Sequence, residues 1–382
     1  MNGHQRKRKA GQRFGWNSAW AVLASVILVV SVCACGGSHS VSREHKGGTR
    51  AIRSTTQATL QHRPRAIPVR PQAKLQVVAE HRLPGQTSRF DYQSLDERRH
   101  LLFIANLGAN QIDVIYTRGP RLVRTIGGIA SPHGILVVPQ LGRVFVSATG
   151  SRQLATIDEA SGRVLARTPA GSYPDGIAYD SIEHRLFVSD ELAGAEVVIN
   201  ARTARPVATI KLGTEAGNVQ YDPRSRRMLV AIDDNGDNQL VLIDPRALHV
   251  VRRIRLTGCE SAHGLHLDVP RRLAFVACAD NSRLRVVDLR ALRVVGPSYP
   301  VGQDPDVLDF DPSLRRLYVA AESGVVSSFI ESGRRLHSVG AYRATAAHAV
   351  SVDPATHRVY VPLASVSGPS MLRVLKPTQR RH

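Results

Sequence analysis

Several signatures of common enzyme classes are missing from this chain of 382 residues. It has no phosphate-binding glycine loop, no dinucleotide-binding fingerprint, no serine-nucleophile motif and no HExxH zinc motif, so the enzyme classes that depend on them are not indicated. Phe, Tyr and Trp make up only 5% of the residues, and arginine far outnumbers lysine among the 51 basic side chains. The hydrophobic content of 43% is nevertheless ordinary, which excludes disorder of the whole chain.

Long apolar runs are also scarce. The run from Ala19 to Ala34 is about 16 residues long, whereas a helix that spans a bilayer needs roughly 18–20. A basic head between Arg6 and Arg13 precedes the run, so residues 1–34 are predicted to be a signal peptide. Its removal would take away five basic and no acidic residues, lowering the net charge from +20 to +15.

The apolar run ends in the sequence VCACGG, residues 32–37, which resembles the lipobox of bacterial lipoproteins. Val32 would stand at position −3, the small Ala34 at position −1, and Cys35 would carry the lipid. An ordinary secretory signal with a chance cysteine is the alternative. The resemblance implies an exported protein, lipid-anchored to the outer face of the bacterial cytoplasmic membrane.

The segment after the signal is not expected to fold. Residues 35–73 are rich in Ser, Thr, Arg, Gln and Pro without an apolar period, which is typical of a disordered tether. A single domain is predicted over residues 74–377, followed by a basic tail at 378–382. The positive charge suits anionic lipid or cell-wall polymer, and a nucleic acid or another polyanion is the alternative partner.

Two of the four cysteines remain once Cys33 and Cys35 are assigned to the signal and the lipid. Cys259 and Cys278 flank a predicted hairpin that turns at Val269–Arg272, which brings them to the same edge of one sheet. A disulfide between them is therefore expected in an exported protein. Free thiols or a metal-binding cysteine pair are the alternatives.

A unit of about 42 residues recurs seven times between residues 90 and 362. Short Val-, Ile- and Phe-rich runs separated by Gly, Pro, Asp and Asn predict four strands in each copy. In the third copy they are expected near 176–179, 186–189, 196–200 and 207–211. No helical period is present, so the sequence predicts an all-β, seven-bladed β-propeller. One large apolar anchor per copy, with spacings of 42, 42, 42, 46, 43 and 42 residues, marks the repeat: Phe103, Phe145, Phe187, Leu229, Phe275, Tyr318 and Tyr360.

The last copy supplies only three strands, near Ala349–Val352, Val359–Leu363 and Met371–Lys376. The apolar segment Leu75–Leu83 precedes the first copy and has no other partner. It is predicted to be the outer strand of the seventh blade, so that an N-terminal strand closes the ring and leaves no sheet edge at the junction.

Particular phrases within the copies resemble those of YVTN-type propeller repeats. The segments 286–292 (VVDLRAL), 242–248 (LIDPRAL) and 155–158 (ATID) are similar to the third-strand phrase VIDxxT. The segments 317–320 (LYVA) and 185–189 (RLFVS) are similar to the tyrosine–valine phrase that names the family. The resemblance covers about residues 75–376 and implies the fold but no particular activity, because such propellers bind diverse ligands.

One position per copy stands twelve residues before the anchor, where the innermost strand begins, and it is polar in every copy except the fourth, where it is Gly217. Because such positions surround the mouth of a propeller's channel, they are predicted to bind a ligand or a partner protein. Imidazole with carboxylate also suits Zn²⁺ or a similar divalent metal, with His133, His263 and His348 as ligands and His266 as a fourth nitrogen. A purely structural role in turns is the alternative. The seven residues are Asp91, His133, Asp175, Gly217, His263, Asp306 and His348.

Two further acidic patterns have simpler explanations. The run Asp233–Asn238 is rich in oxygen ligands like a Ca²⁺ loop, but an Asn-Gly hairpin turn accounts for it. An aspartate also recurs in the tight turn at the opposite end of the innermost strand, where it is predicted to be structural. These turn aspartates are Asp96, Asp180, Asp222, Asp268, Asp311 and Asp353.

Three functional hypotheses follow. The first is a membrane-tethered, extracytoplasmic scaffold that binds a small molecule or a protein at the channel mouth. The second is a metal-dependent lactonase, lyase or hydrolase in which metal-bound water reacts at a His/Asp site. The third is a binder of nucleic acid or cell-wall polymer, which predicts an affinity that falls steeply with salt.

Overall fold

The computed structural model describes residues 75–85, 89–365 and 368–378. The predicted signal peptide (1–34) and tether (35–73) lie outside the described residues, as does the tail at 378–382 apart from Thr378. Within the described ranges, no helix has the length and apolar character needed to cross a membrane.

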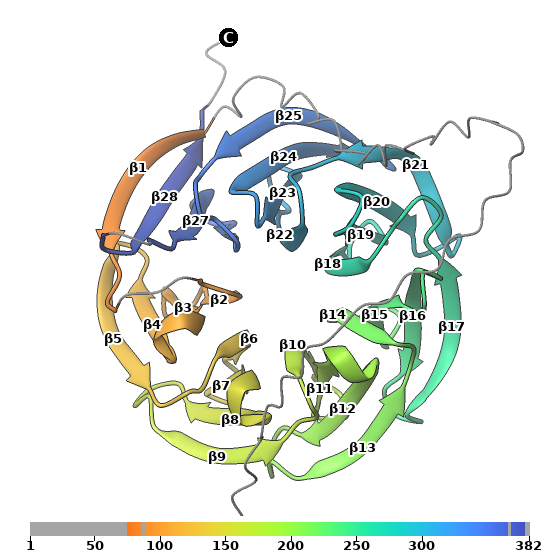
Figure 1. Ribbon diagram of the computed structural model, residues 1–382, viewed down its shortest axis with the longest axis horizontal. Coiled ribbons are helices and arrows are strands. Elements are labelled where there is room, and N and C mark those ends of the chain that lie inside the picture. Colours follow the sequence, from red (N-terminus) through yellow and green to blue (C-terminus); the bar gives the residue numbers. More distant parts are fainter. Residues whose placement is uncertain (1–74, 86–88, 366–367, 379–382) are drawn as a thin grey trace, which may run out of the picture. The chain divides into compact units, whose positions relative to one another are not determined.

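The described residues form seven four-stranded antiparallel sheets, set radially around a common centre (Figure 1). In blades 1–6 the four strands follow one another in the chain, from the innermost to the outermost. The predicted seven-bladed propeller is confirmed.

Blade 1 holds β2 (Gln93–Asp96), β3 (Leu101–Asn106), β4 (Gln111–Tyr116) and β5 (Arg121–Gly127); blade 2 holds β6 (Pro132–Val138), β7 (Arg143–Ala148), β8 (Gln153–Asp158) and β9 (Val164–Pro169). Blade 3 holds β10 (Pro174–Asp180), β11 (Arg185–Asp190), β12 (Ala195–Asn200) and β13 (Pro206–Lys211); blade 4 holds β14 (Glu215–Asp222), β15 (Arg227–Asp233), β16 (Gln239–Asp244) and β17 (His249–Arg255).

The remaining blades continue the same order. Blade 5 holds β18 (Ala262–Asp268), β19 (Leu273–Cys278), β20 (Arg283–Asp288) and β21 (Arg293–Pro300). Blade 6 holds β22 (Pro305–Asp311), β23 (Arg316–Ala321), β24 (Val325–Ser332) and β25 (Arg335–Arg343). Single-turn 3₁₀ helices follow the second strands of blades 1–3: η1 (Leu107–Ala109), η2 (Thr149–Ser151) and η3 (Glu191–Ala193). The four strands expected in the third copy match β10–β13 to within two residues at each end.

The seventh blade contains both ends of the propeller domain. Its sheet has the order β1 (Leu75–Arg82), β28 (Met371–Pro377), β27 (Arg358–Leu363) and β26 (Ser351–Asp353). The N-terminal strand β1 pairs antiparallel with β28, from Leu75 opposite Pro377 to Arg82 opposite Met371. The predicted closure is confirmed, although the innermost strand begins two residues later than expected.

The seven anchors form the middle of the hydrophobic core. Each is at most 1% exposed, and the core continues from blade to blade. Phe103 of blade 1, for example, belongs to the same buried cluster as Ile135 and Val144 of blade 2. Burying a side chain of this size contributes about 1.5–3 kcal/mol, which explains why one large apolar residue recurs in every copy.

A disulfide joins Cys259 and Cys278 as predicted, with a Cα–Cα distance of 5.2 Å. Cys259 precedes β18 and Cys278 ends β19, so the bond ties the start of the innermost strand of blade 5 to the end of its neighbour. Both cysteines are buried.

Polar side chains accept hydrogen bonds from backbone N–H groups at the inner edge of the sheets. The free N–H groups of innermost strands are bound from the preceding blade: Val137 donates to Ser94 Oγ (3.0 Å) and Val352 donates to Asp309 Oδ2 (2.7 Å). The innermost strands also lie very close together. A Cβ on Gly134 would stand 2.1 Å from the Asp175 carbonyl oxygen. Glycine therefore lets adjacent blades hold their mouth residues close together.

Candidate functional site

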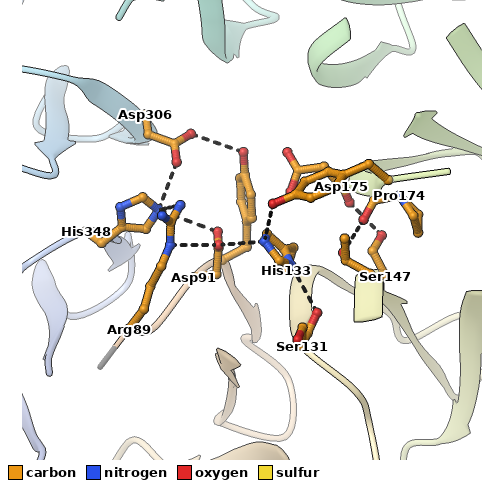
Figure 2. A network of polar contacts seen from close by, with 12 residues as sticks. Arg89, Asp91, Ser131, His133, Ser147, Pro174, Asp175, Asp306 and His348 are labelled. Carbon is orange, nitrogen blue, oxygen red and sulfur yellow. Dashed lines mark hydrogen bonds and ion pairs between the residues drawn. The ribbon is translucent and has the colours of Figure 1, made fainter. Parts of the chain in front are cut away.

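The mouth of the channel is a cavity of about 270 Å³. Five of the six predicted side chains line it, and the sixth, His348, lies beside the cavity against Asp306. Figure 2 shows how residues from blades far apart in the sequence turn toward one another here. Five of these six side chains are buried, and His263 is partly exposed. The structure therefore brings the six predicted side chains of different blades together at one mouth, and their role in binding stays a prediction.

Asp306 lies at the centre of the network. Its Oδ2 is 2.9 Å from His348 Nε2, and its Oδ1 is 3.3 Å from His263 Nε2. The hydroxyl of Tyr92 also lies 3.3 Å from Oδ1. Burial alone would raise the pKa of Asp306, but the two imidazoles hold it well below its usual value.

The two histidines show the complementary change. Burial alone would lower the pKa of His263, but Asp306 and the more distant Asp175 and Glu191 raise it to about 10. For His348, burial is likewise outweighed by Asp306 and Asp91, which raise the pKa to about 10. Both imidazoles are therefore protonated at neutral pH and form ion pairs with Asp306.

Asp91 is a buried carboxylate without a close donor. It is 1% exposed, and neither oxygen has a hydrogen-bond partner among the described residues. Three nitrogens surround it at longer range: Arg89 Nε at 3.5 Å, His348 Nε2 at 3.7 Å and His133 Nε2 at 3.9 Å. Coulomb attraction compensates its charge, while its lone pairs stay available to a donor that enters the cavity.

Arg89 reaches into this part of the mouth from the segment before β2 (Figure 2). Its Nη1 lies 2.8 Å from Glu322 Oε1, and its Nη2 lies 2.9 Å from His348 Nε2. That imidazole nitrogen is also 2.9 Å from Asp306. One nitrogen cannot donate to Asp306 and accept from Arg89 together, so the two contacts exclude each other as hydrogen bonds.

The opposite side of the mouth is arranged differently. His133 Nδ1 lies 3.0 Å from the Ser131 carbonyl oxygen, and its Nε2 lies 3.2 Å from the Tyr173 hydroxyl. In this network Nδ1–H donates to the carbonyl and Nε2 accepts from tyrosine. Burial, followed by repulsion from Asp91, raises the pKa of Asp175 to about 7.

Several lining residues were not anticipated from the sequence. Arg89, Tyr173, Glu215 and Asp304 line the cavity together with Ser261. Each stands two residues before a position twelve residues ahead of the anchor, in or just before the start of the innermost strand. The fixed offset from that position would have revealed them.

The described carboxylates and histidines offer two possible metal groups. Donor atoms of Asp91, Asp306 and His348 lie within 4.8 Å of one another, as do those of Glu191, Glu215 and His263. These are oxygen and nitrogen ligands suitable for a divalent ion. The three histidines predicted to share one ion are separated here: each group contains a single imidazole, and His133 belongs to neither.

The run 233–238 is a turn held by its own bonds. Asp233 Oδ1 accepts from the Gly236 N–H at 2.7 Å, and Asn238 donates to the Gly236 carbonyl at 3.2 Å. The Asp237 carboxylate pairs with Arg255 at 2.9 Å. The hairpin explanation of this run therefore accounts for its contacts.

A second cavity of about 410 Å³ lies along the innermost strands, toward the turn aspartates. Tyr92 stands between the two cavities, because its hydroxyl donates to Asn218 of blade 4 and also lies 3.3 Å from Asp306 Oδ1 of blade 6. His266 lines this second cavity, with Nδ1 3.8 Å from Asp309 Oδ1. His266 therefore does not add a nitrogen to the mouth.

No known protein family and no curated protein matches this chain. Among solved structures, the chain is similar to hydrazine synthase of Kuenenia stuttgartiensis, with a TM-score of 0.65. The likeness covers 76% of this chain and 97% of that chain at 14% sequence identity. At this identity it shows the fold alone. Fold and site together define the class: a seven-bladed β-propeller with a polar, acidic channel mouth.

Proposed function

We propose that the chain is an extracytoplasmic binding scaffold whose channel mouth takes a positively charged ligand, either a small organic cation or a basic side chain of a partner protein. The observation that carries the proposal is the composition of the cavity. Four basic side chains meet eight carboxyl groups at the mouth: Asp91, Asp175, Glu191, Glu215, Asp280, Asp304, Asp306 and Glu322.

This acidic cavity belongs to a chain with a net charge of +20. The excess of carboxylates at the mouth is therefore local, and a concave site of one sign concentrates ligands of the other sign. Asp91 supplies acceptor oxygens without a close donor, and Glu191 supplies a carboxyl whose pKa is raised to about 7 by burial and by Asp175. A bound cation would satisfy both.

Calorimetry on the chain without residues 1–34 tests this proposal. Small amines and basic peptides are expected to bind, and anionic or neutral compounds of equal size are not. The affinity should rise between pH 6 and pH 8, as Asp175 and Glu191 lose their protons, and should fall with salt. Glu215→Gln should weaken binding, with Asp237→Asn outside the cavity as a matched control. Failure of every cationic probe, or a preference for anions, contradicts the proposal.

The envelope location is part of the same proposal. The lipobox-like sequence at Cys35 supports a lipid anchor, and the YVTN-type phrases support membership of that repeat family. Cys35→Ala is expected to move the protein from the membrane fraction to the soluble fraction, whereas Cys33→Ala should not. Equal membrane association of the two variants would overturn the anchor.

A metal-dependent lactonase, lyase or hydrolase is the second candidate function. The group formed by Asp91, Asp306 and His348 favours it, because two carboxylates and an imidazole would leave positions for water on a divalent ion. Metal analysis should then find a stoichiometric ion that is lost in Asp91→Asn. Retention of the same ion content by that variant excludes this group as the site.

The positive charge of the rest of the chain supports a third proposal, a polyanion partner bound away from the mouth. Binding of DNA or a teichoic-acid-like polymer should weaken steeply between 50 and 200 mM salt. Binding that does not change with salt contradicts it.

A further inference from the structure

Six of the eight carboxyl groups of the mouth form two sets on different blades. One set comes from blades 1 and 6, and the other from blades 3 and 4 and the loop at η3. The protonated imidazole of His348 lies against the first set and that of His263 against the second. Asp306 contacts both imidazoles. Both sets face the same cavity of about 270 Å³. The first set is Asp91, Asp306 and Glu322, and the second is Asp175, Glu191 and Glu215.

Arg89 fills the first set from within the chain. Its guanidinium contacts Glu322 at 2.8 Å and Asp91 at 3.5 Å. The residues that line the cavity in the described part of the chain include no second Arg and no Lys. The second set thus faces the cavity with His263 as its close basic neighbour, and Arg89 acts on it only through electrostatic attraction to Asp175.

Arg89 is also an imperfectly matched occupant. Its Nη2 lies 2.9 Å from His348 Nε2, a nitrogen that Asp306 also contacts at 2.9 Å. Its Nε is too far from Asp91 for a good hydrogen bond, and both Asp91 oxygens remain without a donor. An ammonium group has three donors on one compact centre and could bind Asp91 and Asp306 directly.

We propose that the mouth is a two-ended site for linear diamines or guanidino-alkylamines, and that Arg89 occupies one end as an intramolecular competitor. One cationic end of the ligand would bind the second carboxylate set, and the other end would displace Arg89 from the first. This inference rests on the proposed function, since it specifies the cation that the mouth takes. A cavity just below the 300–1,000 Å³ range of drug-sized pockets suits a ligand of this size.

Calorimetry with three probes separates the parts of this proposal. The probes are 1,4-diaminobutane, agmatine and the monoamine 1-aminobutane, titrated into the chain without residues 1–34. A two-ended site should bind either dication at least tenfold more tightly than the monoamine. The monoamine can bind the second set without displacing Arg89.

Variants of Arg89 test the competition. Arg89→Ala should bind 1,4-diaminobutane about tenfold more tightly than the unchanged chain, while its affinity for 1-aminobutane changes less than threefold. Arg89→Lys, which keeps a cation there, should lie closer to the unchanged chain. Arg334→Ala, which removes an exposed Arg paired with Asp288 outside the cavity, is the matched control and should change neither affinity.

The outcomes are distinct. Dication and monoamine affinities within twofold overturn the two-ended site. An equal gain for both ligands in Arg89→Ala overturns the competition and leaves only a general charge effect. In both cases the mouth still binds cations and the proposed function stands. Absence of binding by all three probes in every folded variant, checked by thermal unfolding, overturns the proposed function as well.

Discussion

At the mouth, Asp306 binds two histidines that come from blades 5 and 7, whereas at the other end of the same strand Asp311 accepts the N–H groups of Ser313 and Leu314 in its own turn. The other turn aspartates behave like Asp311, for each accepts from a backbone N–H two or three residues ahead. Asp311 and Asp222 also pair with one side chain of the next blade each, His357 and Arg272. Asp306 is bound by side chains of three other blades: Tyr92, His263 and His348.

The difference separates two uses of one residue type. A turn aspartate stabilises a local conformation that exists as soon as the hairpin forms. A mouth aspartate acquires its partners only when neighbouring blades pack together, and its charge is balanced by groups that a ligand can also contact. Changes at the two ends should therefore differ in what they affect.

Asp306→Ala is expected to have the largest effect. It leaves the buried imidazole of His348 and the partly exposed imidazole of His263 without their carboxylate, and breaking a buried ion pair costs about 3–5 kcal/mol. Urea unfolding at pH 7 measures this loss, and the same variant should lose its affinity for cations. A cost below about 1 kcal/mol would mean that the network at the mouth does not hold the blades together.

Asp180→Ala provides the matching change at the turn end. The buried Asp180 accepts from the Ile182 N–H at 2.9 Å, and loss of such a bond costs about 1–3 kcal/mol. Unfolding should become easier while the affinity for cations stays unchanged. Weaker ligand binding by a variant that remains folded would contradict the separation of the two ends.

The two histidines paired with Asp306 should also make the protein less stable at alkaline pH. The pKa values of His263 and His348 are about 10 in the folded protein, above the ordinary value near 6.5. Their stabilisation is complete below pH 6.5 and is lost as the pH rises through 10. Asp175 and Glu191, whose pKa values are raised to about 7, also reduce stability as the pH rises from about 4 to 7, because the folded protein holds their protons more tightly than the unfolded chain.

Thermal unfolding between pH 7 and pH 10 measures this decline. The double change His263→Gln and His348→Gln should flatten it, whereas Asp180→Ala should keep its slope. An equal slope in all three proteins would show that the decline arises elsewhere in the molecule.

Glu322→Gln should have the smallest effect on stability. This side chain is 40% exposed, and an exposed ion pair such as that with Arg89 contributes less than about 1 kcal/mol. Its effect on cation affinity should be clearer, which would mark a residue of the mouth that serves binding more than folding. A large loss of stability without a change in affinity would reverse this assignment.

The repeat period and the anchors were enough to predict the fold. Phe103 and its counterparts are buried because each fills the same space between blades, so the constraint recurs in the sequence at a fixed spacing. The closing strand was predicted for a related reason: Leu75–Leu83 had the pattern of a strand, and the last copy had one strand too few.

The contacts of the site were less predictable. The mouth positions follow from the period, but the pairing of Arg89 with Glu322 depends on which side chains reach across the ring. Blade 4 illustrates the limit. Gly217 occupies the mouth position because a Cβ there would stand 2.6 Å from the His263 backbone, and its neighbour Asn218 instead binds Tyr92. The repeat pattern does not show that Asn218, and not the residue at position 217, makes the polar contact of blade 4.

The pairing of β1 with β28 also determines how tension would enter the molecule. The chain before Leu75 joins the propeller through an outermost strand, which is hydrogen-bonded along only one side. A pull from the N-terminal side therefore acts first on the β1–β28 ladder. Detachment of β1 would leave the seventh blade with the three strands β26, β27 and β28, while the four strands of each other blade would stay paired.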